Sequence, residues 1–160
     1  MVKNKKNLLL KLILLISIIA LISAFFIEYI LGHQPCNLCT LERIPYFLAI
    51  IVIFLNYKFI EFEKFFILFL TILFLFGTVL SLYHLGIEQG LIQESLVCDL
   101  KSGSNLLSKE EILKQLQEKS VSCKDVTFKI FGLSLTSYNI LISILITFSA
   151  GKIYFNYDKN

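Results

Sequence analysis

The chain contains four long runs of apolar residues, and these runs limit its possible folds more than any other feature. They span about residues 7–31, 44–60, 65–85 and 135–155. An α-helix rises about 1.5 Å per residue, so about 20 apolar residues cross the ~30 Å hydrocarbon core of a bilayer. Charged residues make up only 17% of the chain, against about 25% in soluble domains. The runs predict an all-α polytopic membrane protein, a bundle of four transmembrane helices.

The first run also admits a second interpretation, a secretory signal peptide. MVKNKK is a basic start, and Ser23 and Ala24 are small residues that suit a cleavage point. The apolar segment is longer than the roughly 7–15 residues of a signal-peptide core, and it resumes after that point with Phe25 and Phe26. We therefore expect a retained transmembrane helix.

Lysine and arginine residues indicate how the four helices are oriented. With four spans, both termini and the 61–64 link share one side, and the segments 32–43 and 86–134 share the other. The first side carries eight basic residues (3, 5, 6, 11, 58, 64, 152 and 159) and the second carries seven, so the totals favour neither side strongly. The cluster before the first helix has the most influence on orientation. It predicts that both termini are cytoplasmic and that the two longer links lie outside.

All four cysteines lie in those two outer links. Cys36 and Cys39 are in the first link, and Cys98 and Cys123 are in the second. An even number of spans separates the links, so they lie on the same side whichever way the protein inserts. We therefore expect the four cysteines to meet in one compartment, outside the helices.

The 86–134 loop is the only extended polar region, and its middle predicts a short amphipathic helix, SKEEILKQLQEK (108–119). Ser108 and Glu111 fit a capping box, and Ile112, Leu113 and Leu116 form one apolar stripe. The stripe either lies on the membrane surface or packs against the same loop. In both cases the helix separates Cys98 from Cys123 along the chain.

The cysteine pattern excludes some kinds of chemistry and leaves others open. Inert cysteine usually hides in apolar segments, whereas these cysteines lie in polar links. Four thiolates can bind zinc, but a structural zinc site usually combines two closely spaced pairs, and Cys98 and Cys123 are far apart in sequence. C-type haem attachment requires a histidine directly after Cys-x-x-Cys, and position 40 is Thr. The pattern therefore favours a redox dithiol over zinc.

A relay between the two cysteine pairs fits their placement. A pair on a long loop can meet a soluble protein, and a pair at a helix end can meet a molecule dissolved in the lipid; thiol–disulfide exchange then joins the pairs. Arg43 follows Cys39 by about one helical turn, so its guanidinium either approaches that sulfur, lowering the thiol pKa, or binds lipid phosphates. These residues indicate a membrane thiol oxidoreductase without naming its acceptor. No basic and aromatic face indicates nucleic acid as a partner.

Several stretches resemble the DsbB family, bacterial membrane proteins that reoxidise DsbA. The most specific is PCNLCTLERIPY (35–46), which is similar to the family signature Pro-Cys-x-Leu-Cys-x-x-x-Arg. YHLGIEQG (83–90), CDL (98–100) and FGLSLTSYNILIS (131–143) follow in the family's order. The resemblance covers nearly the whole chain, which we expect to form a single membrane domain over residues 1–160.

The resemblance implies a thiol:quinone oxidoreductase of the bacterial inner membrane. Such a protein reoxidises a periplasmic DsbA-like dithiol protein and passes the electrons to ubiquinone or menaquinone, with neither metal nor flavin. By motif match, Cys98 forms the mixed disulfide with DsbA, Cys123 is its partner, and Cys36 and Cys39 reoxidise that pair.

The resemblance also implies a quinone site next to Cys39. Arg43 would lie close to the quinone ring, and His84, at the outer end of the third helix, would be a second quinone-side residue. Two alternatives remain. One is a non-enzymatic membrane protein whose cysteines bind zinc or staple its loops, and the other is a DsbB relative that serves a dedicated partner.

Overall fold

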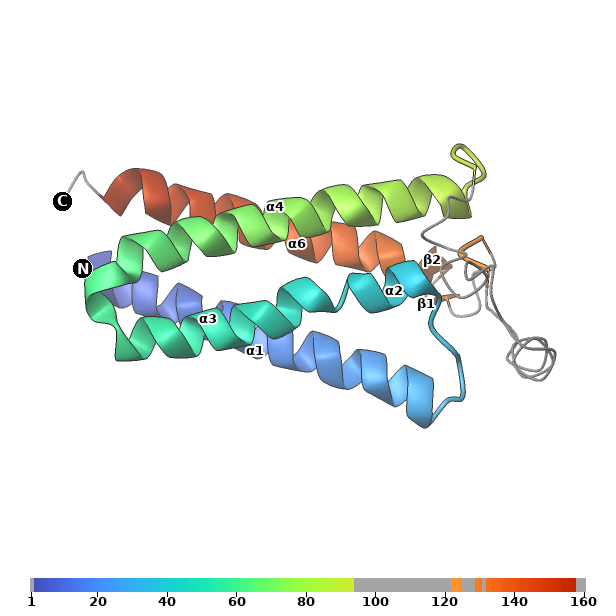
Figure 1. Ribbon diagram of the computed structural model, residues 1–160, viewed down its shortest axis with the longest axis horizontal. Coiled ribbons are helices and arrows are strands. Elements are labelled where there is room, and N and C mark those ends of the chain that lie inside the picture. The colour runs from blue at the N-terminus through green and yellow to red at the C-terminus, as the bar shows by residue number, and fades with distance from the viewer. Residues whose placement is uncertain (1, 94–121, 125–128, 131, 158–160) are drawn as a thin grey trace, which may run out of the picture.

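The computed structural model of the chain describes residues 2–93, 122–124, 129–130 and 132–157. Its secondary structure is almost entirely helical (Figure 1). The elements in chain order are α1 (Val2–Tyr29), α2 (Asn37–Leu41), α3 (Ile44–Lys58), the 3-10 helix η1 (Ile60–Phe62), α4 (Glu63–Glu88), β1 (Lys129–Ile130), β2 (Leu133–Ser134) and α6 (Leu135–Asn156).

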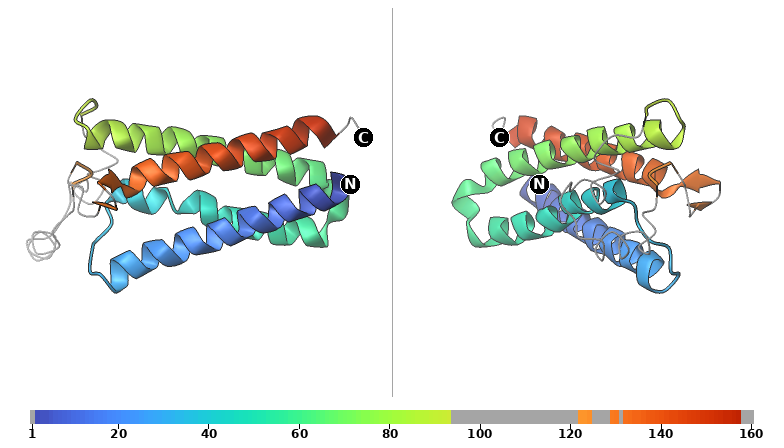
Figure 2. Two further views of the ribbon diagram at one scale, coloured as in Figure 1. Left: turned by 180° about the vertical axis from the view of Figure 1, so that it is seen from behind. Right: turned by 45° about the vertical axis from the view of Figure 1, so that its right-hand side comes forward.

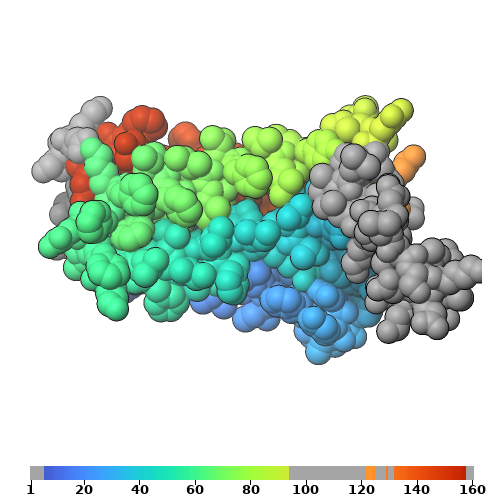
Figure 3. All heavy atoms as spheres, in the orientation of Figure 1, coloured from blue at the N-terminus to red at the C-terminus, as the bar shows by residue number. Residues whose placement is uncertain are grey.

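The long helices form one elongated bundle. Both termini lie at one end, and α2 lies with the antiparallel pair β1–β2 at the other end (Figures 1 and 2). Helix α4 packs along α6, and α1 packs mainly on α3. In the space-filling view, α3 and α4 make up most of the face toward the viewer (Figure 3).

Four helical segments in the described part of the chain are long and apolar enough to cross a membrane. They are Lys6–Tyr29, Asn37–Lys58, Ile60–Glu88 and Leu135–Asn156. Many large apolar side chains on their outward faces are exposed; Leu8, Phe54, Phe76 and Phe148 each expose 60% or more of their surface. Water-soluble proteins rarely expose contiguous apolar surface on this scale. The predicted fold class, an all-α polytopic membrane protein, is confirmed.

The bundle interior combines an apolar core with close contacts at small residues. Leu10 and Ile13 of α1, Ile53 of α3 and Phe74 of α4 are among the buried residues of the core cluster. Gly77 of α4 faces Pro45 of α3, and a Cβ on Gly77 would lie 3.3 Å from Pro45 Cγ. A glycine at this position therefore lets the two helices approach closely, as small residues do between membrane helices.

The link that carries Cys36 and Cys39 differs from its predicted form. We expected residues 32–43 to be a loop with all cysteines outside helices, but Asn37–Leu41 form α2 and Cys39 lies within it. A break at Glu42 and Arg43 separates α2 from α3. Pro45 stands in the first turn of α3, where it cannot donate the backbone hydrogen bond that would continue a helix from the preceding turn. The expectation about Cys39 is therefore wrong, because the helical region begins at Asn37, about two turns before the apolar run does.

The other boundaries also shift. Helix α1 starts and ends earlier than the apolar run 7–31, and α4 extends beyond the run 65–85 at both ends. The extension adds one more turn to α4 and brings His84 and Glu88 into the same helix. The amphipathic helix predicted at 108–119 lies outside the described residues.

Candidate functional site

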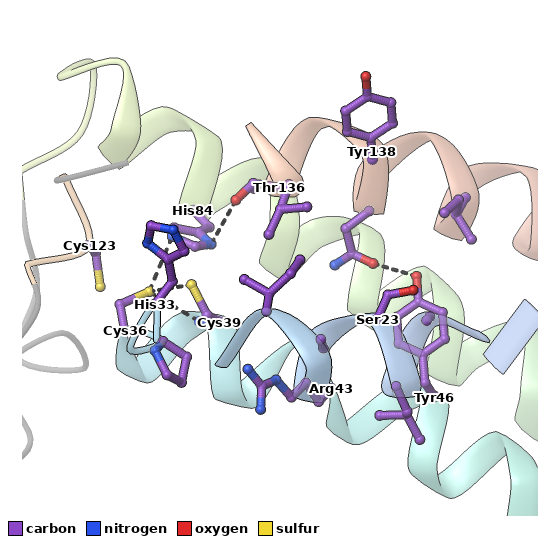
Figure 4. Close-up of a pocket in the computed structure, with 18 of the residues that line it drawn as sticks. Ser23, His33, Cys36, Cys39, Arg43, Tyr46, His84, Cys123, Thr136 and Tyr138 are labelled. Carbon is purple, nitrogen blue, oxygen red and sulfur yellow. Dashed lines mark hydrogen bonds between the residues drawn. The ribbon is translucent and has the colours of Figure 1, made fainter. Parts of the chain in front are cut away.

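A cavity of about 470 Å³ opens at the α2 end of the bundle, between α1 and α6. Most of its wall is apolar, and α1 contributes Ile16, Ile19 and Ile27 to it. Its chemically active side chains are clustered toward one end, while Tyr46 lies toward the other (Figure 4). The active group consists of Cys36, Cys39, Arg43, His84, Glu88 and Cys123.

The two cysteines of the Cys-x-x-Cys motif are free thiols in contact with each other. Cys36 is the N-cap of α2, and its Sγ accepts a hydrogen bond from the backbone N–H of Cys39 at 3.2 Å. The two Sγ atoms are 2.7 Å apart. Cys36 is buried and Cys39 is half-buried, and both line the cavity. The site therefore holds a dithiol that can close to a disulfide with little movement.

Cys36 is the thiol of this pair that favours the ionised form. Its pKa is lowered from 9.0 to about 5, chiefly because the Cys39 thiol donates a hydrogen bond to its sulfur. Burial acts in the opposite direction, and the hydrogen bond and charge of His84 lower the pKa further. A thiolate is the nucleophile in disulfide exchange, so Cys36 is the sulfur prepared for attack.

His84 connects this dithiol to a buried carboxylate. Its side chain comes from α4 and is only 1% exposed. Nε2 lies 3.5 Å from Cys36 Sγ, and Nδ1 lies 2.8 Å from Oε1 of Glu42 and 3.2 Å from Oγ1 of Thr136. The Thr136 hydroxyl donates its own hydrogen to Glu88. Because a carboxylate can only accept, Nδ1 carries a proton and Nε2 is the nitrogen turned toward sulfur.

The polar chain continues from Glu42 into the bundle. Asn139 of α6 donates from Nδ2 to Oε2 of Glu42 at 2.9 Å and to Oγ of Ser81 at 2.7 Å. Tyr46 in turn donates its hydroxyl hydrogen to Oδ1 of Asn139. Buried polar groups need such partners to offset their lost hydration. The network joins α3, α4 and α6, and it holds the carboxylate behind His84 in a fixed position.

Arg43 is paired with Glu28. Its Nη1 donates to Oε2 of Glu28, and its guanidinium lies 5.2 Å from the centre of the Phe25 ring. Both contacts come from α1, so the arginine ties α1 to the start of α3 beside the cavity. Among the described residues, the ion pair and the ring contact of this guanidinium are therefore with α1 and not with the Cys39 sulfur.

Cys123 lies next to the Cys-x-x-Cys motif although it is distant in sequence. It is 3% exposed and belongs to the same buried cluster as Cys36, Leu38 and Ile87. It is held in a disulfide; its predicted partner, Cys98, lies outside the described residues. The structure thus brings three of the four predicted redox cysteines to one wall of one cavity (Figure 4).

The family model described as "DsbB: Disulfide bond formation protein DsbB" matches residues 6–152. The chain belongs to the DsbB family. It is also 33% identical over 165 residues to a protein of Rickettsia prowazekii (strain Madrid E) named "Uncharacterized protein RP370", covering 99% of this chain and 94% of that protein. As a member of the DsbB family, the chain is a multi-pass membrane oxidoreductase that supports disulfide bond formation.

The residues predicted from the DsbB resemblance lie together at the cavity, apart from Cys98, which is outside the described residues. Cys36, Cys39, Cys123, Arg43 and His84 all line it. His84 lies at the outer end of α4, as predicted, and is buried against Cys36. The roles of all these residues remain predictions.

The sequence reasoning missed the polar residues behind this DsbB-family dithiol. Glu28, Glu42, Glu88, Thr136 and Asn139 received no role at the site. One signal was available, because polar or ionisable residues within a membrane span are costly and are often functional. Asn139 lies in an apolar run, and Glu42 directly precedes Arg43. Their partners lie on other helices, which spacing along one chain does not reveal.

Proposed function

We propose that this DsbB-family protein is a thiol:quinone oxidoreductase. It takes electrons from a reduced DsbA-like periplasmic protein and passes them to a membrane quinone. The observation that carries the proposal is a free dithiol, Cys36 and Cys39, in the wall of a mostly apolar cavity that also reaches the disulfide-bonded Cys123. The cavity opens between α1 and α6, two helices whose outward faces are apolar.

The residues of the cavity fit a quinone. Its volume of about 470 Å³ falls within the roughly 300–1,000 Å³ of small-molecule sites, which combine apolar walls with a few polar groups. The apolar wall of α1 suits the ring and the start of the isoprenoid tail, and Arg43 and His84 supply donors near the dithiol. A bound quinone supplies the electron sink: it takes up two electrons and two protons as the dithiol becomes a disulfide.

The relay within the chain follows from the placement of Cys36 and Cys123 in one buried cluster beside the cavity. After Cys98 and Cys123 have been reduced by the partner dithiol, a thiolate of that pair attacks the Cys36–Cys39 disulfide, forming a bond between the pairs. The second thiol of the outer pair then displaces Cys36, which restores the outer disulfide and leaves Cys36 and Cys39 reduced. Two electrons and two protons move inward in this exchange. The redox state of the structure is the one expected after this exchange: Cys36 and Cys39 are free thiols, and Cys123 is disulfide-bonded.

Each neighbouring group acts on one part of this chemistry. Nε2 of His84 contacts the Cys36 sulfur, and the charge of the imidazole stabilises the thiolate of Cys36. Glu42 fixes the orientation of the imidazole. Cys39, the half-buried thiol, faces the acceptor. When its guanidinium turns away from Glu28, Arg43 places a positive charge beside the cavity. This charge stabilises the negative charge that develops on an acceptor bound there as the acceptor is reduced.

The proposed location is the bacterial inner membrane, with the dithiol end in the periplasm. Lys6, Lys58, Lys64 and Lys152 belong to the end of the bundle that holds the termini, and basic residues favour the cytoplasmic side. The DsbA-like partner and its substrates reach the protein from the opposite, periplasmic side. A dedicated partner in place of a general DsbA fits the same chemistry.

The partner half of the proposal is tested by trapping the mixed disulfide. Reduced protein is mixed with a one-cysteine DsbA-like protein activated at that cysteine by a small aromatic thiol. Cys123→Ala is expected to accumulate a covalent complex on non-reducing gels, because Cys98 attacks and no neighbouring thiol resolves the bond. Cys98→Ala is expected to form essentially none, since Cys123 is 3% exposed. Equal trapping by both variants would contradict the assigned order.

A further inference from the structure

The dithiol and His84 form a compact group of metal-ligand atoms. Sγ of Cys36, Sγ of Cys39 and a ring nitrogen of His84 all lie within 4.8 Å of one another. With bonds of about 2.3 Å to sulfur and about 2.0–2.1 Å to nitrogen, tetrahedral zinc separates its ligand atoms by ~3.6–3.8 Å. The distance between Cys36 Sγ and His84 Nε2 is already 3.5 Å. The two sulfurs, now 2.7 Å apart, need to separate by only ~1 Å to reach that spacing.

The buried carboxylate behind His84 prepares the imidazole as a ligand. A metal-binding histidine usually donates its other ring N–H to a carboxylate or carbonyl, which fixes the tautomer and the ring orientation. Glu42 takes this position, with its Oε1 2.8 Å from Nδ1. Asn139 holds the other oxygen of Glu42 at 2.9 Å. Nε2 is consequently the nitrogen available to an ion between the sulfurs.

An oxygen ligand is within reach of the fourth position. Glu88 follows His84 by one helical turn on α4, so both side chains lie on one face. Its Oε1 is 3.7 Å from His84 Nε2 and it lines the same cavity. Zinc sites with three protein ligands commonly complete their shell with water, and a carboxylate oxygen can serve as a fourth protein ligand. Two thiolates also match the preference of zinc for soft ligands.

We propose that Cys36, Cys39 and His84 form a binding site for a thiophilic divalent cation such as Zn²⁺, that the site exists only in the reduced protein, and that the bound ion blocks oxidation of the dithiol. Oxidation to the Cys36–Cys39 disulfide removes both thiolates and therefore the site. Conversely, a bound ion occupies the sulfur electron pairs that form the disulfide. Zinc thus acts as a reversible inhibitor of the reduced state, with no role as a permanent structural ion.

The test is metal binding by full-length protein in detergent. The Cys98→Ser/Cys123→Ser background removes the other two thiols. Co²⁺ is the spectroscopic probe, because tetrahedral thiolate coordination produces charge-transfer and intense visible bands, and Zn²⁺ displaces it for a titration. The reduced protein is expected to bind one equivalent with these bands, and the protein with the Cys36–Cys39 disulfide is expected to show none. Absence of the bands in the reduced protein, or binding that is equal in both redox states, overturns the proposal.

Two variants and a matched control identify the ligand nitrogen. His84→Ala is expected to weaken zinc binding by at least ~100-fold, and Glu42→Gln, which keeps the side-chain shape, by ~10–100-fold. His33→Ala changes the chain's other histidine, which also lines the cavity but does not belong to the compact group of ligand atoms, and is expected to bind zinc as the parent does. If Glu42→Gln and His84→Ala both bind as tightly as the parent, the ion sits on the sulfurs alone and the proposed site is wrong.

The inhibitory part is measured separately from the proposed quinone reaction. Saturating Zn²⁺ is expected to slow oxidation of the Cys36–Cys39 dithiol by a soluble disulfide at least ~10-fold, and a chelator is expected to restore the rate. An unchanged rate with zinc bound refutes the inhibition. Because neither measurement uses quinone or a DsbA-like protein, failure here leaves the proposed function standing, and success does not depend on it.

Discussion

Replacing Cys39 with serine is expected to stop quinone reduction almost completely, by at least ~10³-fold. Serine preserves the size of the side chain and a hydrogen bond to Cys36, but its hydroxyl cannot form a disulfide. The inner pair then cannot form a disulfide, so it cannot pass two electrons from the outer pair to the quinone. The loss of absorbance of the oxidised quinone, with a reduced DsbA-like protein as donor, measures the effect.

A matched variant separates this loss from a general effect on the bundle. The hydroxyl of Thr147 donates to the backbone of Ser143 within α6, away from the dithiol, and Thr147→Ala should keep the rate within about twofold. Cys39→Ser should still form a covalent complex with the one-cysteine DsbA-like protein. Normal quinone turnover by Cys39→Ser would remove the inner dithiol from the proposed pathway.

The reactivity of Cys36 should persist to unusually low pH and depend on His84. With a pKa lowered to about 5, the Cys36 thiolate remains populated from neutral pH down to about that value, and its alkylation rate falls as the pH drops further. In His84→Ala the hydrogen bond and charge of the imidazole are gone, so the pKa rises and the fall in rate begins at higher pH. We expect the midpoint to move up by at least one pH unit, which corresponds to about 1.4 kcal/mol.

The measurement is the pH profile of iodoacetamide labelling at Cys36 in the reduced Cys98→Ser/Cys123→Ser protein, read by mass spectrometry. The contribution of Cys39 persists in His84→Ala, so the midpoint should stay below 9.0. His33→Ala serves as the control and should keep the original midpoint. An unchanged midpoint in His84→Ala would show that the imidazole does not act on this sulfur.

The fold was predictable from the sequence because a lipid environment leaves few alternatives. Only helices satisfy every backbone group within a single span, so runs such as 65–85 and 135–155 indicate helices directly. The ends were less predictable, because α4 continues beyond its apolar run to Glu88, and the polar side chain of that residue conceals the helix. The start of α2 was missed for the same reason, since Asn37 and Thr40 do not resemble a membrane helix.

The candidate site was predictable only in part. The spacing of Cys36 and Cys39 and the resemblance around Arg43 identify the residues of the motif. They do not predict which side chains these residues contact. The contact of His84 with Cys36 joins α4 to the start of α2, and Asn139 reaches Glu42 from α6. Such contacts depend on how the helices pack. The pairing of Arg43 with Glu28 likewise could not be read from spacing along one helix, because the two residues lie on different helices.

The most direct test of the central claim is quinone reduction by the purified protein with a reduced DsbA-like protein as the electron donor. Ubiquinone and menaquinone analogues are compared in parallel, and donor thiols lost are counted against quinol formed. The account predicts one quinol for each donor disulfide, with at least one of the two quinones, and no quinol when Cys36 or Cys39 is replaced. Oxidation of the donor without quinol formation, or quinol formation that survives loss of Cys36, would contradict it.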